Sequence, residues 1–213
     1  MDKYTVVIPT IWKSEYTYEL LKRLSDSEYV GEIILIDNAS ELNKEINIQK
    51  VIHIKEQENT YVNPAWNKGV NLASHNNITI VNDDIIFDVD EYYSYFAQLL
   101  EINEFKNIGF IGSHSENYKL EKSQNPSFEE YDNKTNTGGW GCLFSFHKSN
   151  WKPIPNELKI WYGDNWIHLV SNPILHLRGI KIETKMSTSS DLEEMNPIKE
   201  NDTRIWHRML NII

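Results

Sequence analysis

The chain contains a single cysteine, Cys142, among its 213 residues, so it cannot be held together by a disulfide framework. No CxxC pair and no Cys/His spacing of a zinc site occurs in it, and Cys142, set among apolar residues, is predicted to be a small buried hydrophobe. No apolar run reaches membrane-spanning length and no signal segment opens the chain, so no transmembrane segment is predicted. Because a lone cysteine suits a reducing compartment, we expect a cytoplasmic protein.

Basic residues are outnumbered by acidic ones. The 21 Lys and Arg against 31 Asp and Glu give a formal charge of −10, whereas nucleic acid binding needs clustered Lys and Arg, so we expect no nucleic acid partner. The commonest nucleotide and hydrolase motifs are also missing: GxxxxGK[ST], GxGxxG after a strand, GxSxG and HExxH. The composition, 40% hydrophobic and 24% charged, is that of a globular protein with an acidic, solvated surface.

What the sequence does contain is an alternation of apolar strands and amphipathic helices. Strands are predicted at 4–9, 32–37, 51–55, 77–81 and 107–113, with helices at 15–27, 63–75 and 90–105. Asn63 is a suitable N-cap for the second helix, and Pro64 suits the first helical position. The alternation predicts an α/β fold with a mostly parallel central sheet and helices on both faces.

The second half of the chain has a different texture. Residues 114–137 are polar and rich in turn formers, so we expect a long loop there. Segments rich in glycine and aromatic residues follow. The tail, 202–213, is predicted to form a short helix that packs on the domain through Ile205, Met209 and Ile212.

Two adjacent carboxylates, Asp83 and Asp84, interrupt an apolar stretch in "ITIVNDDIIFDVD". Burying both is costly unless they reach water or a cation. In a parallel α/β sheet, ligands bind beyond the carboxyl ends of the strands, where Asp37 and the Asn82–Asp84 cluster both lie. In an extended segment Asn82 and Asp84 share one face, so Asp84 is the better candidate to hold a divalent cation. A solvent-facing type I turn is the alternative.

Five blocks, in this order and spacing, resemble the nucleotide-sugar glycosyltransferases of family 2: "VVIPT", "LIDNAS", "ENTYVNPAWNKGV", "IVNDDI" and "GGWGCLFSFHKSNW" followed by "WYGDNW". The resemblance covers roughly residues 4–171 and implies the GT-A fold, a Rossmann-like sheet. It implies inverting, metal-assisted transfer, with Mn²⁺ or Mg²⁺, from a nucleotide sugar, expected to be UDP-linked, to a hydroxyl of a glycan, lipid or protein acceptor. Within a single domain, residues 1–113 would bind the nucleotide sugar and residues 114–213, with the C-terminal helix, the acceptor. The oligomeric state is not indicated.

The resemblance implies nucleotide contacts at the ends of the first two strands. Pro9, Thr10 and Ile11 leave the first strand where the family lays a uracil ring against the loop. Asp37 and Asn38 match the family's strand-end "VDDGS" and would face the base and the ribose, since carboxylate and amide oxygens accept from N–H and hydroxyl groups. An Asx turn that closes the strand explains these two residues equally well.

Further nucleotide contacts are implied within the third and fourth blocks. Asn67 would turn its amide toward the nucleotide, the alternative being a polar residue on a solvated helix face. Asn82 stands in place of the first aspartate of the family's DxD, so Asn82 and Asp83 would contact the nucleotide sugar while Asp84 holds the metal. Lys185 lies about where many relatives supply a histidine ligand, and it could hold the diphosphate as a cation. The family's first glycine of the third block is Tyr61 here.

The resemblance assigns the last blocks to the acceptor. Asp164 occupies the position of the family's general base, which removes the proton from the acceptor hydroxyl. Relatives often carry a Glu-Asp pair there, whereas Asn165 follows Asp164 in this chain; an N-cap role for Asp164 is the alternative. Trp140 and Trp161 would offer apolar faces to an acceptor sugar, with core packing as the alternative.

Two other classes of function stay open on the sequence. A sugar-phosphate nucleotidyltransferase would also use carboxylates and Mg²⁺, but it normally has a basic, glycine-rich N-terminal loop, and "IPTIWKSE" has one lysine and no glycine. A non-catalytic nucleotide- or sugar-binding module fits Asn82, Asn165 and the missing histidine. Hydrolysis of a nucleotide sugar would separate an enzyme from such a module.

Overall fold

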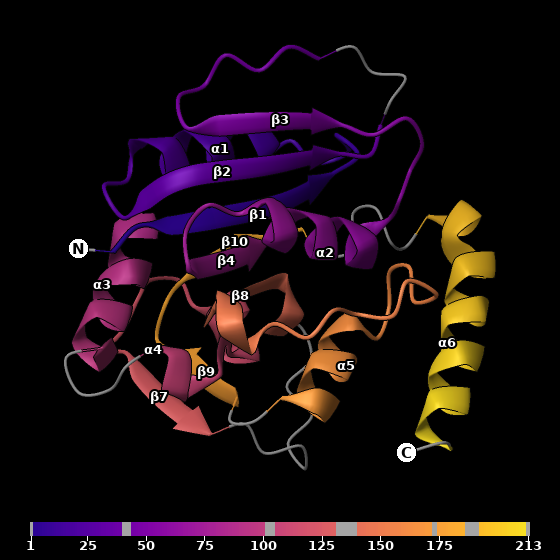
Figure 1. Ribbon diagram of the computed structural model, residues 1–213. Helices are drawn as coiled ribbons and strands as arrows, with labels where there is room; N and C mark the ends of the chain where they lie inside the picture. The colour runs from indigo at the N-terminus through magenta and orange to yellow at the C-terminus, as the bar shows by residue number, and fades with distance from the viewer. Residues whose placement is uncertain are drawn as a thin grey trace.

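A large sheet forms the centre of the computed structural model, which describes residues 2–39, 44–100, 105–130, 140–171, 174–185 and 192–211 (Figure 1). The strands are β1 (Tyr4–Thr10), β2 (Val30–Asp37), β3 (Val51–Lys55), β4 (Asn77–Val81), β5 (Ile85–Phe87), β6 (Phe110–Ser113), β7 (Ser127–Glu130), β8 (Leu143–His147), β9 (Ile174–Arg178) and β10 (Ile182–Thr184). The helices are α1 (Thr17–Asp26), α2 (Val62–Leu72), α3 (Val89–Leu100), α4 (Phe105–Ile108), α5 (Gly163–Val170) and α6 (Asn196–Leu210). Short 3₁₀ turns are η1 (Ser115–Lys119), η2 (Trp140–Cys142), η3 (Lys148–Asn150) and η4 (Glu193–Met195).

The sheet has the order β3-β2-β1-β4-β8-β6-β9-β7, and six of its eight strands run in one direction. The strand β8 runs against β4 and β6, and β7 runs against β9. A two-stranded antiparallel sheet, β10-β5, stands beside it. The predicted α/β class with a mostly parallel sheet is therefore confirmed. Strands from both halves of the chain share the one sheet.

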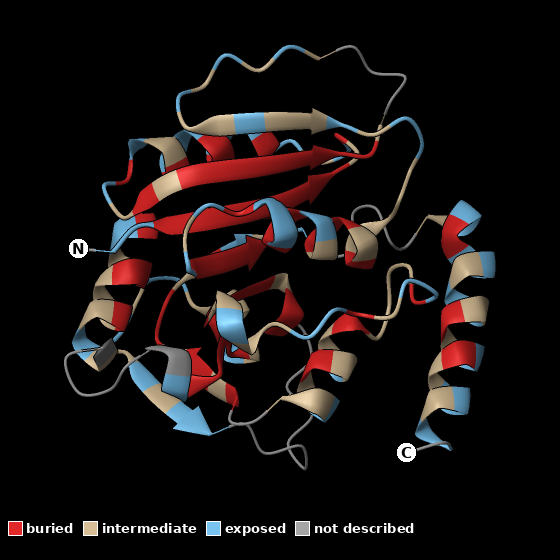
Figure 2. Cartoon of the chain, in the orientation of Figure 1, coloured by how far each residue is buried: buried red, intermediate tan, exposed pale blue. Residues whose placement is uncertain are grey.

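Helices cover both faces of the sheet, and side chains alternate between them along each strand. In β1, Val6 and Ile8 face the core beneath α1 and α3, whereas Val7 faces the core beneath α2. The α2 side also holds Ile167 of α5 and Ile205 of α6. Because both faces are covered, β1 and β2 are buried along almost their whole length (Figure 2). Among the described residues, no helix has the length and apolarity to cross a bilayer.

Several predicted boundaries differ from the structure. The segment 114–137 contains η1 and β7, so the expected long loop is wrong for the part that the structure describes; residues 131–137 lie outside it. The helix α2 begins at Val62, so Asn63 lies inside its first turn and is not the N-cap. The helix α6 begins at Asn196, earlier than predicted, with a proline in its first turn; Ile205 is buried on it, and Ile212 lies outside the described residues.

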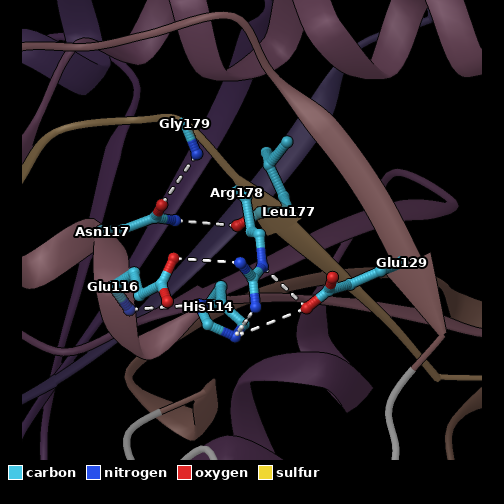
Figure 3. Close-up of polar contacts among 7 residues, drawn as sticks. All are labelled: His114, Glu116, Asn117, Glu129, Leu177, Arg178 and Gly179. Atoms are coloured by element: carbon cyan, nitrogen blue, oxygen red, sulfur yellow. Dashed lines mark hydrogen bonds and ion pairs between the residues drawn. The ribbon is translucent and has the colours of Figure 1, made fainter.

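One edge of the sheet is held by a polar cluster around Arg178 of β9 (Figure 3). Its guanidinium donates to Glu129 of β7 at 2.7 Å and to Glu116 of η1 at 3.0 Å, and it contacts the His114 ring at 2.9 Å. On the same turn, Asn117 donates to the Leu177 carbonyl and accepts from the Gly179 amide. Burial and the adjacent Arg178 lower the pKa of His114, so the cluster contains a neutral imidazole near neutral pH. These contacts fix η1, which carries Tyr118, beside the strand ends.

Candidate active site

A cavity of about 410 Å³ opens at the carboxyl ends of β1, β2 and β4, as expected for a parallel sheet. Its volume is in the range of small-molecule sites. The wall comes from both halves of the chain: Pro9, Thr10, Ile11, Asn38, Asn59, Tyr61, Val62, Trp66, Asn82, Asp83, Asp84, Gly141, Cys142, Ile160, Trp161, Tyr162, Asp164, Asn165 and Met195. Nine of the predicted site residues are therefore brought together around one cavity.

The turn between β4 and β5 places all three of its polar residues on the cavity wall. We predicted an extended segment with Asp83 pointing away, but the chain turns at Asp83 and Asp84, and both are more than nine-tenths buried. Asp83 accepts from the hydroxyls of Thr10 at 2.5 Å and Thr17 at 3.2 Å. Burial raises the pKa of Asp83 to about 6, although the two hydroxyl bonds oppose the rise. One oxygen of Asp83 is thus already engaged, and the solvent-facing turn is excluded.

Asp84 lies close to Cys142 and to Tyr118. Burial, with the carboxylates of Asp84 and Asp164, raises the pKa of the Cys142 thiol to about 12. Burial also raises the pKa of Tyr118 well above its usual value, and its hydroxyl bonds Ser113 at 2.6 Å and the Cys142 thiol. Cys142 is half-buried on the cavity wall rather than in the core. A neutral thiol and a neutral phenol therefore stand beside two carboxylates.

Asp164 lies in the first turn of α5 and lines the cavity near Cys142. The N-cap position is Tyr162, in the left-handed region with φ 66°, so capping does not explain Asp164. Gly141 lets Asp164 approach, because a Cβ on Gly141 would come within 2.8 Å of the Asp164 Cβ. Burial raises the pKa of Asp164, while the Asn165 amide that donates to its Oδ1 at 2.9 Å opposes the rise. A carboxylate with a raised pKa is a stronger base.

Asp37 and Asn38 end β2 differently from each other. The buried Asp37 accepts from the Ala39 amide at 2.9 Å, the bond of an Asx turn, and its other oxygen lies 2.9 Å from His53 Nε2. It is not among the residues that line the cavity. Asn38 lines the cavity, and its Oδ1 accepts from the amide and hydroxyl of Thr60. Asp37 therefore organises the strand end, and Asn38 faces the cavity.

Besides Asp37, three other predicted site residues do not line the cavity. The Asn67 amide does not reach the cavity: it donates to the Ile154 carbonyl at 2.8 Å and accepts from the Ile154 amide at 2.9 Å, which pins the segment before α5 to α2. Trp140 is a core residue, 4% exposed, that packs edge-on against Phe144 with an angle of 62° between the ring planes and lies tightly against Gly112, so it is not an acceptor platform.

Lys185, the third of these residues, is exposed and directly follows β10. Its ammonium group pairs with Glu15 and stands 5.8 Å from the centre of the Tyr16 ring. It is not among the described residues that line the cavity. The Ser/Thr-rich stretch that follows Lys185, residues 186–190, lies outside the described residues.

Tyr61 is a cavity residue that the sequence indicated only indirectly. Its backbone has φ 67° and ψ −177°, a conformation that is almost restricted to glycine, and relatives carry a glycine here. Asn38 and Asn59 hold the corner: Asn59 Oδ1 accepts from the Tyr61 amide at 2.8 Å, and Asn38 donates to the Tyr61 carbonyl. Tyr61 therefore adopts a glycine-like backbone conformation and adds an aromatic ring to the cavity wall.

The strain at Tyr61 predicts an unusual order of stabilities. Strain of this kind costs about 1–3 kcal/mol and glycine relieves it, whereas alanine does not. We expect Tyr61→Gly to unfold with a free energy about 1 kcal/mol higher than Tyr61→Ala, measured by urea denaturation. Equal stabilities, or alanine above glycine, would contradict the strain.

Four of the other wall residues that we did not predict are apolar: Val62, Trp66, Ile160 and Met195. An apolar residue carries no chemical signature in a sequence, and these four come from three separate segments that only the fold brings together.

A metal-binding cluster of three or more His, Cys, Asp or Glu is not found in the part of the chain that the structure describes.

A sequence model described as "Glycosyl transferase family 2" matches residues 5–150 of the chain. No curated protein sequence matches it. The fold of this chain is similar to the folds in three crystal structures, among others. Their sequence identities to the chain are low, so the similarity concerns the fold alone. S. aureus TarS 1–349 has a TM-score of 0.62 at 14% identity over 85% of this chain and 60% of that one. TarS 1–349 in complex with UDP-GlcNAc has a TM-score of 0.59 at 14% identity over 92% and 64%. GalNAc-T7 with UDP, GalNAc and Mn²⁺ has a TM-score of 0.58 at 12% identity over 86% and 44%.

The chain thus spans between 44% and 64% of the length of the chains in these three structures. The predicted GT-A fold is confirmed by this likeness.

Proposed function

Because this chain belongs to glycosyl transferase family 2, we propose that it transfers a sugar from a UDP-linked donor to an acceptor hydroxyl, with inversion and with the help of a divalent cation. The observation that carries the proposal is one cavity lined by carboxylates from two separate segments of the chain, Asp84 at the strand ends and Asp164 at the start of α5, both of which lie near Cys142. The division into a donor half, 1–113, and an acceptor half, 114–213, is part of the same proposal.

Asp164 is the group we assign to the acceptor. As a carboxylate it would take the proton from the acceptor hydroxyl as that oxygen attacks the anomeric carbon, opposite the departing diphosphate, which inverts the configuration. The nearby wall residues Ile160, Trp161 and Tyr162 are apolar or aromatic and suit the apolar faces of a sugar. Trp161 lines the cavity, unlike Trp140, and we assign it to the acceptor side.

The charge of the wall supports a role for a cation. The described lining residues include Asp83, Asp84 and Asp164 and no Lys, Arg or His. A diphosphate would be repelled there unless a cation intervened. Asp84, a buried carboxylate on the cavity wall at the strand ends, is the residue that we assign to a hard divalent ion, and such ions often take few protein ligands. Mn²⁺ or Mg²⁺, when bound, would neutralise charge on the leaving diphosphate.

The proposal is tested by incubating the protein with UDP-GlcNAc and other UDP-sugars, with and without Mn²⁺. We expect UDP to be released slowly to water when Mn²⁺ is present, and UDP with Mn²⁺ to raise the melting temperature. Chelation with EDTA should reverse both effects. Binding without any release of UDP would favour the non-catalytic module, and neither binding nor release would reject the proposal.

A further inference from the structure

The helix α6 carries a fully buried carboxylate, Asp202, that holds the acceptor side of the cavity. It lies outside the residues that the family model matches. Its oxygens accept from three consecutive backbone amides: Lys159 at 3.0 Å, Ile160 at 2.8 Å and Trp161 at 3.1 Å. Charge-assisted bonds of this kind are stronger than neutral ones, and here they compensate the burial of the charge.

The carbonyl groups of the same segment are held from the other side by α2. The side-chain amide of Asn63 donates to the carbonyls of Leu158 at 3.3 Å and Trp161 at 3.2 Å. The backbone N–H of Asn63 donates to the Lys159 carbonyl at 2.9 Å. The segment is therefore fixed between two helices, because the N–H groups of 159–161 donate to α6 and the carbonyls of 158, 159 and 161 accept from α2. Figure 1 shows α6 alongside the chain that leads into α5.

Side chains extend the contact with α6 to the start of α5. The Tyr162 ring stacks on Trp206, 5.5 Å away and nearly parallel, and the Tyr162 hydroxyl bonds the Thr203 hydroxyl at 3.0 Å. Lys199 stands over the Trp161 ring at 5.6 Å. Tyr162, with its left-handed backbone, immediately precedes the helix that bears Asp164. A displacement of 159–162 would therefore move Trp161 and Asp164 together.

We propose that Asp202 is a positioning residue for the transfer reaction, which sets the segment 159–162 and through it the acceptor wall and the carboxylate of Asp164. This inference rests on the proposed function. The donor side is built from the ends of β1, β2 and β4. In the described part of the chain, the hydrogen bonds of Asp202 go to Lys159, Ile160 and Trp161 and not to these strand ends. Its loss should therefore affect the reaction step and leave donor binding alone.

The test is Asp202→Asn, which keeps the side-chain volume but replaces one acceptor oxygen by a donor that faces backbone N–H groups. Glu200→Gln, an exposed carboxylate on the same helix, is the matched control. The probe is the UDP-sugar that the wild type hydrolyses fastest, with Mn²⁺, below the melting temperature of every variant. We expect kcat to fall about tenfold or more, since small misplacements of reacting groups are costly, with the donor KM within about twofold of wild type. Asp202→Glu should recover part of the loss, and Glu200→Gln should match wild type.

An unchanged kcat, or a rise in KM that accounts for the whole effect, would overturn the inference. Should Asp202→Asn fail to fold, Thr203→Val gives the same reading: it removes the bond to Tyr162, and the inference requires a lower kcat at unchanged KM. An inactive wild type would instead reject the proposed function, so the two failures can be told apart.

Discussion

Replacing Asp164 with asparagine is expected to abolish sugar transfer and to leave UDP binding intact. General bases contribute about 10²–10⁴-fold to a rate, and an amide cannot take the proton. The fold should tolerate the change, because burial raises the pKa of Asp164 and the neutral amide has no charge to bury. Release of UDP from the donor measures turnover, and calorimetric titration with UDP and Mn²⁺ measures binding.

Glu157→Gln is the matched control for Asp164→Asn, because Glu157 is an exposed carboxylate on the same connection to α5. It should retain wild-type turnover. Retained turnover in Asp164→Asn itself would reject the base assignment. A loss of UDP affinity as large as the loss of turnover would mean that Asp164 binds the donor.

The pH dependence of wild-type turnover gives a second test of Asp164 as the general base. The base works only when ionised, and its raised pKa places the acid limb of the kcat profile at a higher pH than an exposed carboxyl would give. Turnover should therefore decline as the pH falls through that limb while UDP stays bound. In Asp164→Asn the residual rate should lack this limb.

The sheet and its site edge were predictable because their signals are local. Apolar runs such as 77–81 coincide with the observed strand, and turn-forming residues mark the strand ends that meet at the cavity. The five family-like sequence blocks then indicated which of these strand ends belong to the site. Asn38, Asp84 and Asp164 reached the cavity wall as predicted, since each is tied to the end of a strand or the start of a helix.

Side-chain direction was not predictable to the same degree. The Asn67 side chain bonds the Ile154 backbone, which is distant in sequence. An asparagine amide could bond either a nucleotide or a backbone segment, so the residue type did not decide between the two. Trp140 is buried because Gly112 makes room for it, which no neighbour in sequence reveals. Asp202 carried no motif. These outcomes depend on long-range packing. The cytoplasmic location stays a prediction.

Replacing Asp84 with asparagine is expected to remove the cation-dependent part of UDP binding. The amide keeps the volume of the turn but loses the charge that we assign to the metal–diphosphate, and even changes in groups that only support a metal ligand cost about 10–100-fold in affinity. We expect UDP affinity in the presence of Mn²⁺ to fall at least about 100-fold. Calorimetric titrations of UDP with Mn²⁺ and with EDTA give the two affinities.

The control for Asp84→Asn is Glu58→Gln, an exposed carboxylate next to the cavity residue Asn59 that changes the net charge by the same amount. If long-range charge alone governed the binding of an anionic nucleotide, both variants would bind UDP slightly better than wild type, because each removes one negative charge. If Asp84 binds the cation, the two variants move in opposite directions in Mn²⁺. Equal behaviour of Asp84→Asn and wild type at every Mn²⁺ concentration would refute the metal role. The sign of the change therefore separates a ligand from a bystanding charge, since a carboxylate that merely repels the diphosphate cannot strengthen its binding.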